Sequence, residues 1–166
     1  LSTAGLMFLI SSNDLLLLFI SLELVSISSF VLAGFERSNP KSNEGAMKYF
    51  LFGAFSSAIM VYGISFFFGA TGSTHITVSG LAQSPMLILS LILIVLGLAF
   101  KASLAPMHFW VPDAYEGAPT PVTTFFSIAP KLATFAALMR LRFVLTVGLQ
   151  QDLHLLLGLL AILTMT

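Results

Sequence analysis

The stretch LILSLILIVLGLAFKASLAPMHFW, residues 87–110, joins a long apolar run to a lysine and a proline. Thirteen of its first fourteen residues are apolar or glycine, and Lys101 then follows, with Pro106 five residues later. The apolar run predicts a membrane helix. Because a proline has no N–H group and its ring clashes with the preceding turn, we expect this helix to break near Ala102–Pro106.

The length of this helix places the lysine inside the membrane. A helix from Met86 to Lys101 is about 24 Å long at about 1.5 Å per residue, which is shorter than a hydrocarbon core of about 30 Å. Non-helical backbone at that depth is tolerated only where protein or a water-filled cavity satisfies it. A broken helix with a lysine beside the break is therefore a candidate ion site.

The composition of the whole chain agrees with a membrane protein. Of its 166 residues, 57% are hydrophobic and only 8% are charged, whereas soluble domains carry about 25% charged residues. The net charge of zero gives no basic patch for nucleic acid, and the lack of cysteine excludes disulfides, thiolate metal sites and cysteine-bound iron–sulfur clusters. We predict an all-α, polytopic transmembrane bundle of about five helices that forms one membrane domain, residues 1–166.

Apolar runs of helical length divide the chain into spans. We expect spans at residues 14–35, 45–69, 86–101 and 119–142, the end of an earlier helix in 1–12 and the beginning of a fifth helix in 153–166. The stretches FERSNPKSNEG (35–45) and VGLQQD (147–152) are predicted loops. Since the terminal apolar runs are too short to span, we expect a piece of a longer or divided subunit.

Four ionisable residues stand within the apolar runs: Glu23, Lys48, Lys101 and Lys131. Each costs about 2.5–3.5 kcal/mol at a helix centre on insertion scales. Glu23 has Ser26 on its own helix face and Ser29 at the edge of that face. It is either a packing glutamate that bonds between helices, or a proton acceptor or the partner of a lysine. Lys48 either extends to the membrane interface or pairs with Glu23.

Lys131 belongs to a polar stripe on an otherwise apolar helix. Spacings of 4, 3, 4 and 3 relate its members, which are Thr120, Thr124, Ser127, Lys131 and Thr134. Pro130 cannot donate to the carbonyl of Phe126, and this free carbonyl beside the stripe can hold water. The alternative is that the stripe only forms hydrogen bonds between helices.

Proton loading is the chemistry that these residues favour. Burial favours the neutral form of a lysine, and a nearby carboxylate favours the charged form, so a moving partner makes Lys101 hold or release a proton. His108 is a relay candidate because histidine titrates near neutral pH; a structural histidine is the equal alternative. Asp113, Tyr115 and Glu116 either end a half-helix, line a proton entry or shape a turn, and the turn is favoured because Asp, Gly and Pro are turn residues. The three histidines are too scattered for a metal site, and no motif indicates catalysis by this chain.

Three stretches together resemble one protein family. They are LFISLELVSISSFVLAGF (18–35), NEGAMKYFLFGAFSSAIMVYGISFFFGATG (43–72) and FKASLAPMHFWVPDAYEGAPTPVTTFFSIAPK (100–131). They resemble the antiporter-like membrane subunits of respiratory complex I, most of all subunit 2, called subunit N in bacteria. The segment FFSIAPK (125–131) is more similar to mitochondrial than to plastid members of the family.

The resemblance implies a proton-pumping module with a discontinuous helix in the mitochondrial inner membrane. Glu23 matches the family's glutamate, Lys101 its partner lysine on the broken helix, and Lys131 the lysine that passes protons towards the middle of the membrane. Lys48 and His108 match further polar positions. No redox centre is implied for this chain: NADH, FMN, iron–sulfur clusters and ubiquinone are expected elsewhere in the complex.

The length of the chain departs from the family pattern. The family has about fourteen helices in two inverted repeats, and both repeats are needed for transport. This chain resembles only the N-terminal and central part. We therefore expect other membrane-arm subunits, membrane lipid, and a second chain or segment that supplies the rest of the subunit as its partners.

Two other functions remain open. The first is a subunit of a cation/proton antiporter complex, which shares the fold. The second is a structural remnant that only scaffolds the membrane arm. The presence of all four buried charges argues against the remnant.

Overall fold

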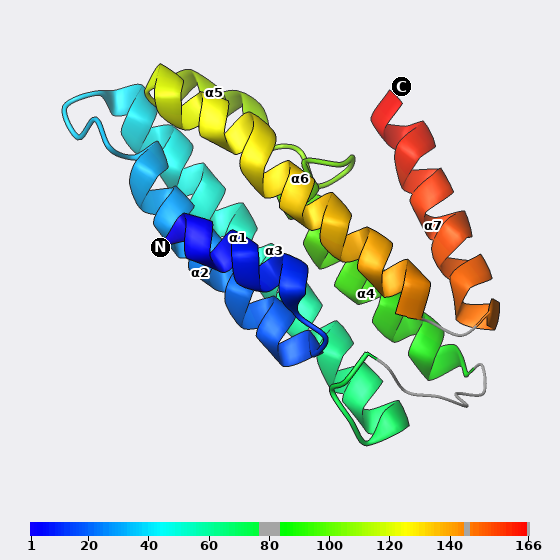
Figure 1. Ribbon diagram of the computed structural model, residues 1–166. Helices are drawn as coiled ribbons and strands as arrows, with labels where there is room; N and C mark the ends of the chain where they lie inside the picture. Colours follow the sequence, from blue (N-terminus) through cyan, green and yellow to red (C-terminus); the bar gives the residue numbers. More distant parts are fainter. Residues whose placement is uncertain (77–83, 145–146, 166) are drawn as a thin grey trace.

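The computed structural model describes residues 1–76, 84–144 and 147–165, which form seven α-helices (Figure 1). They are α1 (Ser2–Ser11), α2 (Leu15–Ala33), α3 (Pro40–Thr71), α4 (Pro85–Ala102), α5 (Val111–Gly117), α6 (Thr120–Val144) and α7 (Val147–Met165). Four helices, α2, α3, α4 and α6, are long and apolar enough to cross a membrane. The predicted all-α transmembrane bundle is confirmed, and α5 is an additional short helix.

Capping residues decide where the long helices begin. Asn39 accepts a hydrogen bond from the N–H of Lys41 at 3.1 Å, and Pro40 occupies the first turn. Ser84 and Pro85 begin α4 in the same way. Since proline has a helical φ and lacks an N–H that would stay unbonded there, α3 begins at Pro40, and the predicted loop 35–45 is too long.

The beginning of α7 also differs from the prediction. Residues 147–152, expected as a loop, form the first turns of this helix. Glutamine is a good helix former, and Leu149 and Leu153, four residues apart, are both buried. The helical spacing of these leucines therefore outweighs the polar residues between them.

Small residues allow the helices to approach closely. Helix α3 packs against α2 and α4, while α1 packs back on α2, and α7 lies at the edge of the bundle against α4 and α6 (Figure 1). A Cβ atom at Gly97 would lie 2.6 Å from Cβ of Met60, and one at Gly63 would lie 2.9 Å from the backbone of Ile94. Glycine at such positions lets neighbouring backbones come together.

The break after α4 occurs where the sequence predicts it. Ser103 adopts the left-handed region at φ 60°, and its N–H donates to the carbonyl of Phe100 at 3.1 Å. The N–H of Leu104 donates to Ala99 at 2.9 Å. Helix α4 thus ends at Ala102, before Pro106, and the next helix, α5, begins at Val111.

Helix α5 docks on the first turns of α3. A Cβ atom at Gly45 would lie 2.5 Å from the carbonyl oxygen of Asp113, and one at Gly117 would collide with the carbonyl of Lys41. Ion pairs Lys41–Glu116 and Lys48–Asp113 join the two helices. Backbone contact and charge together position the segment that follows the break.

We predict that Gly45→Val separates α5 from α3. The new side chain meets backbone, which cannot rotate away, and such overpacking costs about 1–3 kcal/mol. The midpoint of thermal unfolding in detergent should fall. The matched control is Gly158→Ala, because nothing lies within 4 Å of a Cβ atom there. Equal midpoints for both variants would contradict the docking role of Gly45.

Asp14 joins the beginning of α2 to the segment after α3. Its carboxylate accepts hydrogen bonds from the N–H of Leu16 at 2.8 Å and from the hydroxyl of Thr74 at 2.6 Å. Burial alone would raise the pKa of Asp14, but the hydrogen bonds from Thr74, Leu17 and Leu16 outweigh burial and lower the pKa below 3.8. The charged carboxylate is therefore the form that stabilises the fold.

We predict that Asp14→Ala lowers the free energy of unfolding at neutral pH by about 0.5–2 kcal/mol, the usual cost of a lost helix cap. Because the folded-state pKa is depressed, this contribution is present above pH 3.8 and is lost as the pH falls through the folded-state value. Unfolding curves of both proteins at neutral and acidic pH should converge in acid. A constant difference at all pH values would show that the charge is not responsible.

Candidate functional site

Lys101 is the centre of the candidate site. It lies in the last turn of α4 with only 1% of its surface exposed. Its ammonium donates hydrogen bonds to the hydroxyl of Tyr49 at 2.8 Å and to Oγ of Ser26 at 3.3 Å. Both partners are neutral, and in the described part of the chain no carboxylate forms an ion pair with Lys101.

Glu23 lies beside this lysine without touching it. It interacts with Lys101 through its charge, and its carboxylate accepts a hydrogen bond from the hydroxyl of Ser57 on α3. Ser26, three residues further along α2, bonds Lys101 and not Glu23. The structure thus joins Lys101 to α2 through Ser26, and Glu23 to α3 through Ser57, without an ion pair between Glu23 and Lys101.

Aromatic rings enclose the other side of the lysine. Tyr49 stacks on Trp110 with ring centroids 4.0 Å apart and planes 8° apart. Its ring also meets Phe30 edge-on at 4.7 Å, and Phe126 at 5.7 Å. Ser29 interacts with the Tyr49 hydroxyl. These contacts bring α2, α3, α6 and the segment after the break together around Lys101.

Lys48 has different partners from the one predicted. Its ammonium pairs with Glu44 at 2.6 Å and with Asp113 at 2.9 Å, so of the two alternatives for Lys48 the pairing with Glu23 is not formed. The physical reason is α5, which presents Asp113 to the α3 surface that carries Lys48. Asp113, Tyr115 and Glu116 lie on this helix and not in a turn.

The polar side chains of the α6 stripe become more buried from Thr120 towards Thr134. Thr120, Thr124 and Ser127 are exposed, Lys131 is half-buried, and Thr134 is buried. The hydroxyl of Thr134 donates to the carbonyl of Pro130 at 2.7 Å. Lys131 lies over the ring of Tyr115, with its ammonium 5.6 Å from the ring centroid. Tyr115 in turn meets Trp110 edge-on, with ring centroids 6.2 Å apart, so Lys131 is linked to the rings around Lys101 only through Tyr115.

His108, the last of the predicted proton-transfer residues, lies at the surface of the bundle. His108 is exposed and stacks on Phe109, with ring centroids 5.2 Å apart, so the structure does not bring it to Lys101. Within residues 1–76, 84–144 and 147–165, no group of three potential ligands is arranged to hold a metal ion.

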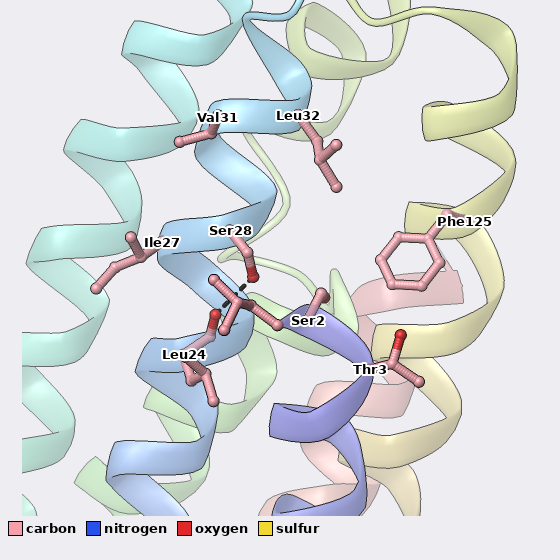
Figure 2. A pocket seen from close by; sticks show the side chains of 9 residues that line it. Ser2, Thr3, Leu24, Ile27, Ser28, Val31, Leu32 and Phe125 are labelled. Carbon is pink, nitrogen blue, oxygen red and sulfur yellow. Dashed lines mark hydrogen bonds between the residues drawn. The ribbon is translucent and has the colours of Figure 1, made fainter.

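An apolar pocket of about 520 Å³ lies apart from these charges (Figure 2). It lies between α1, α2 and α6 and is lined mainly by aliphatic side chains: Leu1, Leu24, Ile27, Val31 and Leu32, with Phe125, Ser2, Thr3 and Ser28. The hydroxyl of Ser28 donates to the carbonyl of Leu24, so it is already bonded (Figure 2). With no charged side chain in its wall, the pocket is unsuited to proton transfer.

Sequence reasoning missed Tyr49 and Ser57. Tyr49 follows the conspicuous Lys48, but an aromatic residue in an apolar run is usual. The signal was the spacing of small residues on α3, because Ser42, Gly45, Gly53 and Ser56 recur at helical intervals and place Tyr49 on their buried face.

Comparisons with known proteins agree with this arrangement. A family model described as NADH:quinone oxidoreductase/Mrp antiporter, TM, matches residues 12–166. The NADH-quinone oxidoreductase subunit N of Trichlorobacter lovleyi is 46% identical over 99% of this chain and 35% of that protein. The F(420)H(2) dehydrogenase subunit N of Methanosarcina mazei is 42% identical over 99% of this chain and 34% of that protein.

A solved structure of respiratory complex I from Thermus thermophilus with bound aureothin contains a similar chain. The TM-score is 0.79 at 42% identity, over 85% of this chain and 32% of that one. This chain spans about a third of the length of the curated relatives described above. The extent of the family match and the identity to full-length relatives lead to one conclusion: the chain belongs to the NADH:quinone oxidoreductase/Mrp antiporter transmembrane family.

Proposed function

We propose that this chain is part of a proton-translocating membrane-arm subunit of respiratory complex I, in which quinone reduction is coupled to proton pumping. The observation that carries the proposal is Lys101, a fully buried lysine at a helix break whose hydrogen-bond partners are neutral hydroxyls. An ionisable residue within a membrane span is by default a functional one.

The geometry around Lys101 supports reversible proton loading. The two hydroxyls accept from the charged ammonium, and Glu23 adds a negative charge nearby. A change in the distance between Glu23 and Lys101 alters the preference for the charged form. Glu23 is bonded to Ser57 on α3 while Lys101 ends α4, so a shift between these helices changes that distance.

The complete transport path requires more than this chain. A transporter of inverted repeats holds its site at the interface between the repeats, and the chain covers about a third of its relatives. We therefore propose that a further segment or chain supplies the second repeat. Other membrane-arm subunits and lipid would cover the large exposed apolar side chains of the spans.

The electron donor and the redox cofactors belong to the rest of the complex in this proposal. The relatives carry the same subunit letter in an NADH-quinone oxidoreductase and in an F(420)H(2) dehydrogenase, which favours a subunit that is independent of the donor. We propose that NADH, FMN, iron–sulfur clusters and ubiquinone bind elsewhere, and that this chain is a non-redox part of the enzyme.

A cation/proton antiporter subunit is the second candidate, because the description of the matching family includes the Mrp antiporter. It predicts sodium-dependent transport without a link to NADH. A structural remnant predicts instead that the removal of a buried charge affects assembly at most.

We predict that Lys101→Ala lowers coupled NADH–quinone turnover and proton pumping severalfold in the assembled complex, because the loading group is removed. The rates are measured in reconstituted vesicles with a quinone assay and a pH-sensitive dye. Arg37→Ala is the matched control, since it removes one positive charge from an exposed position outside the site. Full pumping by assembled Lys101→Ala complexes would sink the role given to this lysine.

We predict that the chain resides in a very large NADH-oxidising complex of the mitochondrial inner membrane. The mitochondrial location rests on the segment FFSIAPK (125–131). The relatives described above come from Trichlorobacter lovleyi and Methanosarcina mazei. Mitochondrial membranes would be extracted with mild detergent, separated on a native gel and stained for NADH dehydrogenase. Mass spectrometry should find the chain in the stained band. Its presence elsewhere without NADH activity would favour the antiporter.

A further inference from the structure

The partner nearest to the Lys101 ammonium is a residue that the proposed mechanism has not used. The hydroxyl of Tyr49 lies 2.8 Å from Nζ, whereas Oγ of Ser26 lies 3.3 Å away. The ammonium also lies 5.1 Å from the centroid of the tyrosine ring. The ammonium therefore lies beyond the hydroxyl end of the ring, and Tyr49 offers the lysine a hydrogen-bond acceptor that favours a cation.

The ring of Tyr49 is held from several sides. Only 1% of the residue is exposed. Trp110 stacks on one face at 4.0 Å, and Phe30 and Phe126 meet the ring edge-on at 4.7 and 5.7 Å. A ring packed in this way cannot follow a moving lysine, so its hydroxyl is a fixed reference point. Lys101 itself is a flexible side chain with several rotatable bonds.

Trp110 connects the fixed ring to the helix break. Its indole N–H donates to the carbonyl of Phe100 at 3.2 Å, which is the residue directly before Lys101. The same tryptophan is the residue that precedes α5. The stacked pair Tyr49–Trp110 thus contacts the end of α4 and the beginning of α5 at once.

We propose that Tyr49 is a positioning residue that fixes the ammonium of Lys101 at the break through its hydroxyl group. This inference rests on the proposed function, since it concerns the same lysine. Tyr49 acts through Lys101 and does not itself carry the transported proton. The aromatic packing sets the place of the hydroxyl, and the hydroxyl sets the place of the ammonium.

The test is Tyr49→Phe in the assembled complex, which removes the hydroxyl and keeps the stacked ring. Tyr62→Phe is the matched control, because Tyr62 lies on the same helix and is 60% exposed. Proton pumping per assembled complex should fall with Tyr49→Phe by up to the severalfold loss expected for Lys101→Ala, because a hydrogen bond to a charged group is lost, and stay unchanged with Tyr62→Phe. Both variants should assemble in normal amounts on a native gel.

A double-variant comparison separates positioning from a structural role. If Tyr49 acts through Lys101, then Tyr49→Phe lowers pumping in the native background and adds nothing to Lys101→Ala. An additional loss in the double variant, or failure of Tyr49→Phe to assemble, would overturn the inference, since the hydroxyl would then act independently of the lysine.

The outcomes also separate this inference from the proposed function. Normal pumping by Tyr49→Phe, with pumping lost in Lys101→Ala, would reject the positioning role and keep the proton-loading role. Normal pumping by Lys101→Ala would reject the proposed function and, with it, the inference.

Discussion

The structure depends on how backbone groups are satisfied at a helix break within the membrane. No water is present in the hydrocarbon core to bond free N–H and C=O groups. Here the N–H groups of Ser103 and Leu104 turn back to the last carbonyls of α4. The side chain of Trp110 donates to Phe100, and the N–H of Ala105 donates to Thr164 of α7. The break is therefore stabilised by segments distant in sequence, which fixes where α7 and the α5 segment pack.

The same arrangement explains the environment of Lys101. Because Trp110 is drawn to the carbonyl of Phe100, its ring lies against Tyr49, and the Tyr49 hydroxyl then lies beside the ammonium. The groups that satisfy the backbone are thus the groups that enclose the charge. Lys101 contacts two hydroxyls, while the carboxylate of Glu23 interacts with it without an ion pair.

The sequence predicted features that depend on local chemistry. Pro106 and the shortness of the apolar run gave the break and the depth of Lys101, and the repeated apolar runs gave the spans. The partners of Lys48 were left open between two alternatives and not found, because Asp113 lies on α5, a helix of seven residues that is too short for periodicity and contains turn-forming residues. Tyr49 was missed because its importance arises from contacts with three other helices and not from its residue type.

A series of aromatic rings links the surroundings of the two lysines. It runs from Lys101 to Lys131 through Tyr49, Trp110 and Tyr115, in that order. The buried hydroxyl of Tyr115 has no hydrogen-bond partner among the described residues. The face of a ring carries no exchangeable proton, so these contacts alone form no proton path. The ion pairs that join α5 to α3 are at least partly exposed and hence individually weak. The segment after the break is therefore held mainly by close backbone packing at Gly45 and Gly117 and by the stacking of Trp110 on Tyr49.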